Sequence, residues 1–297
     1  MRAIASRSAS TVWRERCHES YYLGFSRDLA IDHAVPNASI QNEQSLVSCR
    51  HRERLEKPVL SEEIDYKAGR MVLKGFLAAP GGAGLNPALL IAHEAPGLSP
   101  HTRDIAVRAA ETGYVALAPD YLGESRMLTD MQAVMDQVSA WVSDPSPLRQ
   151  CMKAAHDVVL ARSDIYPARI GGLGYCFGGQ ALVEYARTGA DLAAIVGFHS
   201  GMSVNRPDES RAIRAKILLC MGANDPITKQ SERLAFEQEM NSAGVDWRMI
   251  VYGKVGHSCT NPAVDALGMT GLADDRIADQ ASWGAMLDFL RECGFRG

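Results

Sequence analysis

Cys176 is the residue whose surroundings most clearly favour nucleophilic chemistry. It lies in the pentapeptide 174–178, GYCFG, between the apolar stretch 170–173 and a helix-like segment, 177–187. A nucleophile on a sharp strand-to-helix turn needs small flanking residues, so that the backbone can bend and the helix can pack closely on the strand. The N-terminal amides of the following helix would favour a thiolate. The same pentapeptide could also form an ordinary glycine-rich turn with a structural cysteine.

Asp225 and His257 are the candidate partners of this thiol. A thiol nucleophile needs a base, which a carboxylate usually orients. Each candidate closely follows an apolar stretch, 216–221 for the acid and 247–252 for the histidine. The order nucleophile, acid, histidine, each after a strand, is typical of hydrolases with this kind of turn. The other histidines lie in the first 57 residues, in loops or helices, or before the acid. We therefore predict a Cys176–His257–Asp225 triad.

A further carboxylate and two backbone amides complete the predicted site. Glu94 directly follows the apolar stretch 88–93, at the strand end nearest the expected turn. A carboxylate is poor core material, so a catalytic role competes with that of a surface acid or a structural ion pair. The N–H groups of Ala95 and Phe177 could stabilise the negative oxygen of a tetrahedral intermediate.

Alternating strands and helices must position these residues. Strands are expected at 62–67 and 71–78 (a hairpin turned at 68–69), 88–93, 114–118, 170–173, 193–198, 216–221 and 247–252, and helices at 103–112, 127–142, 148–162, 177–187, 228–243 and 276–292. Such alternation predicts an α/β fold, with a mainly parallel sheet of about eight strands and helices on both faces. In such sheets, ligands bind beyond the carboxyl ends of the strands.

The first 57 residues differ from the rest of the chain. They lack strand alternation and sustained helical periodicity, which predicts an irregular or disordered extension. The first fourteen residues contain Arg2, Arg7 and Arg14 but no acidic residue, which makes this segment weakly similar to a transit peptide. It has no apolar core for a secretory signal. Residues 58–297 show no second change in composition, so we expect them to form one domain.

Composition narrows the class of protein. The chain has 297 residues, 46% hydrophobic and 22% charged, with a net charge of −4, so neither nucleic acid nor an anionic membrane is an expected partner. No apolar run approaches the roughly 20 residues that cross a bilayer. Seven scattered cysteines suit a reducing compartment, and we expect a cytoplasmic protein. A zinc site formed by Cys17, His18, Cys49 and His51 is conceivable, but their spacing matches no common zinc motif. We therefore expect no metal or other cofactor.

Five motifs in order carry a family resemblance. They are HEAPGL around Glu94, APDYLG at 118–123, GYCFGG around Cys176, GANDP around Asp225 and GHSCTNP around His257. With them the sequence resembles the dienelactone hydrolase (carboxymethylenebutenolidase-like) family, from about residue 62 to the C-terminus. The resemblance implies an α/β-hydrolase fold and hydrolysis of a lactone or ester through an acyl-cysteine intermediate.

The resemblance also implies roles for single residues. Cys176 would attack the carbonyl carbon, His257 would accept the thiol proton and later activate water, and Asp225 would orient the imidazole. The glutamate that matches Glu94 contacts the resting thiol and moves when substrate binds. The family usually places an arginine that grips a substrate carboxylate four residues after the histidine, and here that position is Asn261.

Other interpretations stay open at this point. The same triad could hydrolyse a thioester or a larger carboxylic ester. A redox-sensing or binding protein could use Cys176 without turnover, although such a cysteine needs no Asp–His pair and no resolving cysteine lies nearby in sequence. Arg126 could supply positive charge or be an ordinary exposed loop residue, and Cys259 is expected to line the site. The expected partner is a small ester or lactone, and the protein is expected to be a monomer or a small homo-oligomer.

Overall fold

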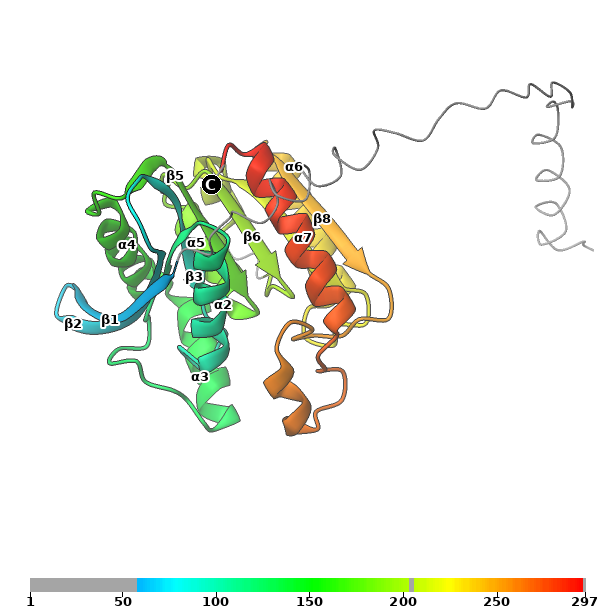
Figure 1. Ribbon diagram of the computed structural model, residues 1–297. Helices are drawn as coiled ribbons and strands as arrows, with labels where there is room; N and C mark the ends of the chain where they lie inside the picture. Colours follow the sequence, from blue (N-terminus) through cyan, green and yellow to red (C-terminus); the bar gives the residue numbers. More distant parts are fainter. Residues whose placement is uncertain (1–57, 203–205, 296–297) are drawn as a thin grey trace, which may run out of the picture. The chain divides into compact units, whose positions relative to one another are not determined.

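The computed structural model describes residues 58–202 and 206–295, all of which belong to one compact unit (Figure 1). The expectations for residues 1–57 (an irregular extension, transit-peptide character and a conceivable zinc ligand set) lie outside the described residues.

One eight-stranded sheet forms the centre of the unit. Its strands, in spatial order, are β1 (Val59–Ala68), β2 (Met71–Pro80), β4 (Val115–Ala118), β3 (Asn86–Ala92), β5 (Ile165–Tyr175), β6 (Ala194–Phe198), β7 (Lys216–Gly222) and β8 (Trp247–Tyr252). The hairpin β1–β2 is antiparallel and joins β4 in antiparallel fashion, and all other neighbours are parallel. The predicted α/β-hydrolase sheet is therefore confirmed.

Helices cover both faces of this sheet (Figure 1). Two of them, α2 (Pro100–Glu111) and α7 (Arg276–Glu292), pack on one face, whereas α3 (Met131–Ser143), α4 (Ser146–Leu160), α5 (Phe177–Ala186) and α6 (Gln230–Ala243) contribute to the core on the other. Strand β3 shows why both faces are needed. Leu89 and Ile91 point to the α2–α7 core and Leu90 and Ala92 to the opposite core, because successive side chains alternate along a strand.

Four predicted helix starts differ from the structure: α2 begins three residues earlier and α6 two residues later than expected, and the shifts of α3 and α4 have a local cause. The helix expected from residue 127 begins at Met131, because the Asp130 carboxylate caps it by accepting a hydrogen bond from the N–H of Ala133 at 2.9 Å. Ser146 and Pro147, expected as a separator, form the first turn of α4, where proline is tolerated because its missing N–H has no helical partner. Two short 3₁₀ segments were not predicted, η1 (Pro207–Ala212) and η2 (Pro262–Leu267).

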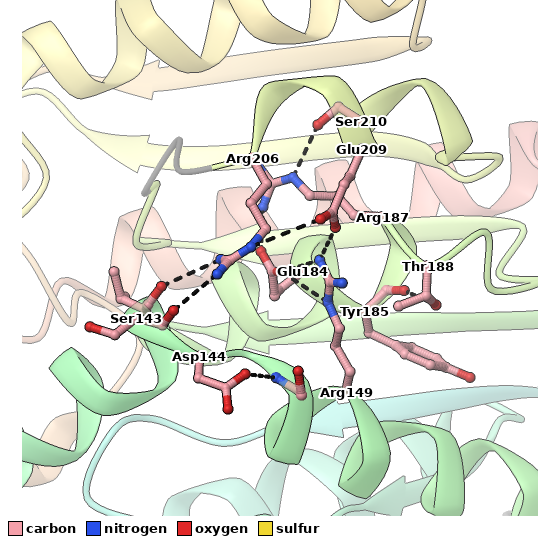
Figure 2. Close-up of polar contacts among 12 residues, drawn as sticks. Ser143, Asp144, Arg149, Glu184, Tyr185, Arg187, Thr188, Arg206, Glu209 and Ser210 are labelled. Atoms are coloured by element: carbon pink, nitrogen blue, oxygen red, sulfur yellow. Dashed lines mark hydrogen bonds and ion pairs between the residues drawn. The ribbon is translucent and has the colours of Figure 1, made fainter.

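A second feature absent from the sequence prediction is a buried ion-pair network that ties α4, α5, η1 and α6 together. It consists of Arg149, Glu184, Arg187, Glu209 and Glu239, and Figure 2 shows the part around Arg149. Arg187 donates to Glu184 Oε2 and to Glu239 Oε1, each at 2.7 Å, with side chains only 2% and 1% exposed for Arg187 and Glu239. Arg149 joins through its Nε–H, 3.0 Å from Glu184 Oε1.

Candidate active site

Cys176 lies on a tight turn between β5 and α5. Its φ of 52° is in the left-handed region, which is unusual for a residue with a side chain. Backbone hydrogen bonds hold this conformation: the Cys176 N–H donates to Phe198 O at 3.1 Å, and Cys176 O accepts from the N–H groups of Gly179 at 3.2 Å and Gly201 at 3.0 Å. A strained backbone conformation persists only where its surroundings fix it, and such residues cluster at functional sites.

The glycines on either side of Cys176 allow a close backbone contact. A Cβ atom at Gly178 would lie 2.1 Å from Ala92 O, and one at Gly174 would lie 2.4 Å from the nitrogen of Gly179. Neither position can hold a side chain without moving backbone. The first turn of α5 therefore rests directly on the end of β3, as the sequence pattern predicts for the turn.

Asp225 and His257 meet beyond the carboxyl ends of β7 and β8. Asp225 Oδ2 accepts a hydrogen bond from His257 Nδ1 at 2.7 Å, with both side chains buried. The other carboxylate oxygen, Oδ1, accepts from the N–H groups of Ile227 at 2.8 Å and Thr228 at 2.9 Å. Because both oxygens are fixed, the carboxylate holds the imidazole with a proton on Nδ1 and leaves Nε2 as the reactive nitrogen.

The charges of this pair support each other. Burial lowers the pKa of His257, but the Cys176 sulfur and the hydrogen bond to Asp225 outweigh this and raise it to about 10. Burial raises the pKa of Asp225, yet its hydrogen bonds bring it below the ordinary value. Within the described ranges, His257 Nε2 has no hydrogen-bond partner. The ring is therefore electrostatically linked to Cys176 while its outer nitrogen stays available.

Glu94 lies beside the turn that holds Cys176. Ala92 pairs with Gly174 across the neighbouring parallel strands, and Glu94 and Cys176 each follow two residues later. The Glu94 side chain is buried, and its Oε2 accepts a hydrogen bond from Asn261 Nδ2 at 2.8 Å. Burial raises the pKa of the Glu94 carboxyl, although the Asn261 bond and His257 oppose this. Glu94 is thus neither a surface acid nor, among the described residues, part of an ion pair.

An aromatic cluster supports the loops around Cys176. Phe177 stacks on Trp141 of α3, with ring centroids 4.8 Å apart, and Tyr121 meets Trp141 edge-on at 5.5 Å. Tyr121 also stacks on His93 at 3.6 Å and donates its hydroxyl hydrogen to His93 O. Burial lowers the pKa of His93 to about 4, so this ring is neutral near pH 7. Tyr121 belongs to the APDYLG motif, whereas no pattern in the sequence singles out Trp141.

His199 precedes Asp225 in the chain, so the expected order of the triad excludes it as the base. In the structure it lies against the candidate base, His257. Its ring centroid is 5.0 Å from that of His257, and its Nε2 is 3.0 Å from Thr260 Oγ1. Burial, and then the neighbouring His257, lower the pKa of His199 well below its usual range. A neutral ring can support His257 without adding charge. The order of residues along the chain does not reveal this contact.

Three other predicted residues have clear positions. Ala95 and Phe177 are buried at the starts of the loop after β3 and of α5, and neither backbone N–H is used in the turn and cap hydrogen bonds of the described chain. Their part in binding an oxyanion stays a prediction. Arg126 is exposed, and its guanidinium donates to Leu122 O at 3.2 Å.

Cys259 is buried close to His257 in the chain, and its place as a lining residue of the site stays a prediction. It packs with Val255 and Ala278 in a small apolar cluster, and burial raises its pKa to about 12. The part of the chain that the structure describes holds no group of three or more His, Cys, Asp or Glu side chains arranged for a metal ion. Nor does any helix within it have the length and apolar character needed to cross a membrane.

Comparisons with known proteins agree with this fold. Residues 73–294 match the dienelactone hydrolase family. A Bradyrhizobium sp protein named "Probable 2-oxo-3-(5-oxofuran-2-ylidene)propanoate lactonase" is 26% identical over 232 residues, covering 74% of this chain and 90% of its own. The solved structure of m3DLH has a TM-score of 0.77 at 36% identity, over 79% of this chain and 98% of that one.

A second solved structure gives a similar result. It is a dienelactone hydrolase-like promiscuous phosphotriesterase from metagenomic libraries, with a TM-score of 0.76 at 31% identity, over 79% of this chain and 98% of that one. The family match covers most of the chain, and the fold and the order of the motifs agree with it. The chain belongs to the dienelactone hydrolase family and is a hydrolase that acts on ester or lactone bonds.

Proposed function

We propose that Cys176, His257 and Asp225 form a catalytic triad that hydrolyses small lactones or carboxylic esters through an acyl-cysteine. The observation that carries this proposal is the 2.7 Å bond between Asp225 Oδ2 and His257 Nδ1, in a histidine whose pKa the Cys176 sulfur raises. The strained turn at Cys176 and the lactonase name of the Bradyrhizobium relative support it.

In acylation, His257 Nε2 accepts the proton of the Cys176 thiol, and the resulting thiolate attacks the carbonyl carbon and forms a carbon–sulfur bond. The carbonyl electron pair moves to the oxygen, where the N–H groups of Ala95 and Phe177 would stabilise it. Collapse of this intermediate breaks the bond to the alcohol oxygen, which takes a proton from His257 Nε2. A lactone opens at this step, so its hydroxyl stays attached to the acyl group.

Deacylation reverses the roles around the thioester. His257 Nε2 accepts a proton from water as the water oxygen attacks the thioester carbon, and the carbon–sulfur bond then breaks. The products are a carboxylic acid and the regenerated thiolate–imidazolium pair, so one water is consumed for each ester bond. Asp225 holds the ring in one orientation through both steps.

Glu94 is the fourth proposed member of the site. It lies two residues after Ala92 as Cys176 lies two residues after Gly174, and this matching register supports a position of its carboxyl beside the acyl group of a bound substrate. In the structure its carboxyl is hydrogen-bonded to Asn261 rather than to the thiol. Because this bond uses Oε2, a contact with the resting thiol would use Oε1 or require Oε2 to leave Asn261.

The proposal is tested with Cys176→Ala and p-nitrophenyl butyrate. We expect kcat/KM to fall on the order of 10³-fold or more, because the covalent route is lost. Circular dichroism and the melting temperature should stay close to those of the wild type. Undiminished turnover by the variant would overturn the assignment. A panel of dienelactone, neutral lactones, aryl esters and acyl-thioesters, compared by kcat/KM, then ranks lactonase, esterase and thioesterase activity.

A further inference from the structure

Asn261 is fixed in the structure before any substrate binds. It is the N-cap of η2, and its Oδ1 accepts a hydrogen bond from the N–H of Ala263 at 3.1 Å. Because Oδ1 is used in this way, the amide hydrogens of Nδ2 face Glu94, 2.8 Å from its Oε2. Both side chains are buried. The pair is therefore a buried contact held in one orientation, and we call it the Glu94–Asn261 wall.

This wall contains a carboxyl but no cation. Among the described residues, no lysine or arginine forms an ion pair or hydrogen bond with Glu94. Arg126, the basic residue of the adjoining loop, directs its guanidinium to Leu122 O instead. His257 is the only charged group that lowers the pKa of Glu94, and burial still leaves that pKa raised. A neutral amide therefore supplies all the direct hydrogen-bond support this carboxyl has among the described residues.

A substrate acyl group on Cys176 must lie next to this wall. Glu94 and Cys176 each lie two residues after the paired residues Ala92 and Gly174 of neighbouring parallel strands, and the first turn of α5 rests on Ala92. A carboxylate on the acyl group would face a buried carboxyl that no lysine or arginine accompanies among the described residues, and the positive charge of His257 is already shared with Asp225 and the Cys176 sulfur. Burying a charge without a partner is strongly unfavourable, whereas an uncharged acyl group meets no such penalty.

We infer that the Glu94–Asn261 pair makes the acyl subsite selective for uncharged esters and lactones over those that carry a free carboxylate. This inference rests on the proposed function, because it assumes that the acyl group is carried by Cys176. Asn261 acts in it as a specificity-determining residue through Glu94, without a part in bond making or breaking.

The test compares two substrates that differ only in one charge, mono-p-nitrophenyl glutarate and its methyl ester. After subtraction of the rate without enzyme, we expect wild-type kcat/KM to favour the methyl ester by about tenfold or more, the discrimination expected from one unpaired charge in a partly buried site. Comparable kcat/KM for the two substrates would overturn the inference.

Asn261→Arg extends the test by adding a positive charge beside Glu94. We expect the ratio of kcat/KM for the ester to that for the acid to fall about tenfold or more in this variant. An unchanged ratio in a folded variant would contradict the inference. If the variant does not fold, the wild-type ratio still decides.

Two controls separate the possible failures. Arg126→Gln should leave the ester-to-acid ratio unchanged, and a loss of activity on the acid alone would show that Arg126 supplies a cation, contrary to the inference. Cys176→Ala should be inactive on both substrates. If Cys176→Ala stays active, the proposed function fails. If it is inactive but the wild type accepts the acid as readily as the ester, only the selectivity inference fails.

Discussion

Two buried polar clusters in this protein are built in opposite ways. In the ion-pair network, Arg187 binds two carboxylates, Glu184 and Glu239, and Arg149 binds a third from η1. Apart from Glu239 Oε2, the buried charged atoms there have partners. In the candidate active site, His257 Nε2 has no hydrogen-bond partner within the described residues, and Glu94 is held by a neutral amide.

The difference separates groups that hold helices together from groups that we propose to react. Paired charges of opposite sign fix α4, α5, η1 and α6, and breaking one pair leaves a buried charge uncompensated. The site instead holds His257 Nε2 and the Glu94 carboxyl close to Cys176, whose backbone is strained. Groups with perturbed pKa values often gather in this way at functional sites. Substitutions in the two clusters should therefore affect different quantities.

The largest expected effect is on activity. His257→Gln should lower kcat/KM for p-nitrophenyl butyrate on the order of 10⁴-fold, because the general base and acid of both steps is removed. Steady-state kinetics against the wild type measure it. A reduction of less than about tenfold would mean that another residue carries the proton transfers.

In the network, the expected effect is on stability. Glu239→Gln should lower the free energy of unfolding by about 3–5 kcal/mol, because Arg187 loses a buried partner. Urea unfolding measures this change, and kcat of the folded variant should stay close to that of the wild type. Asp157→Asn, which breaks the exposed Lys153–Asp157 pair, is the matched control and should cost about 0.5 kcal/mol or less. Equal costs for the two variants would contradict the distinction between the clusters.

A third prediction concerns the close contact under the turn. Gly178→Ala should cost about 1–3 kcal/mol of stability and also lower kcat, because a Cβ 2.1 Å from Ala92 O forces backbone near Cys176 to move. The control is Gly284→Ala within α7, where a Cβ meets no atom within 4 Å and helix propensity should add about 0.5–1 kcal/mol. Normal activity of a stable Gly178→Ala protein would show that the turn tolerates a side chain.

The smallest expected effect is that of Glu94→Gln on the free energy of unfolding, and it should depend on pH. At a pH below the ordinary Glu pKa, Glu94 is protonated in both states and contributes no pH dependence. Its folded-state pKa is raised, so as pH increases the unfolded state ionises first and the folded state loses stability. Glu94→Gln removes this loss and can keep a hydrogen bond from Asn261.

The free energy of unfolding of Glu94→Gln should therefore rise relative to that of the wild type between pH 4 and pH 8, by roughly 1 kcal/mol or less. Chemical denaturation at the two pH values measures this difference. A pH-independent difference, or a relative loss at pH 8, would argue that the carboxyl is stabilised in its charged form.

Much of the scaffold could be predicted because it depends on local patterns. The apolar strand 216–221 and the helix 276–292 follow directly from periodicity, and the structure places β7 and α7 almost at those bounds. The positions of Asp225 and His257 also follow, since the carboxyl ends of parallel strands share one edge of the sheet. Their side chains meet there as the triad hypothesis requires.

Contacts between distant residues could not be predicted in the same way. Asn261 and Glu94 are 167 residues apart, and nothing in the local pattern of either one indicates the other. The network around Arg187 likewise joins helices whose relative placement is set by the whole core. The packing of Cys259 on Val255 and Ala278 is a further example, because its position two residues after His257 does not indicate these contacts.

The nucleophile is tested most directly by trapping the acyl group. Wild-type protein is quenched with acid during turnover of p-nitrophenyl butyrate, and intact mass and peptide mapping then locate the label. We expect one butyryl group per chain, on Cys176, and none in Cys176→Ala. A butyryl group on another residue, together with undiminished turnover by Cys176→Ala, would contradict it.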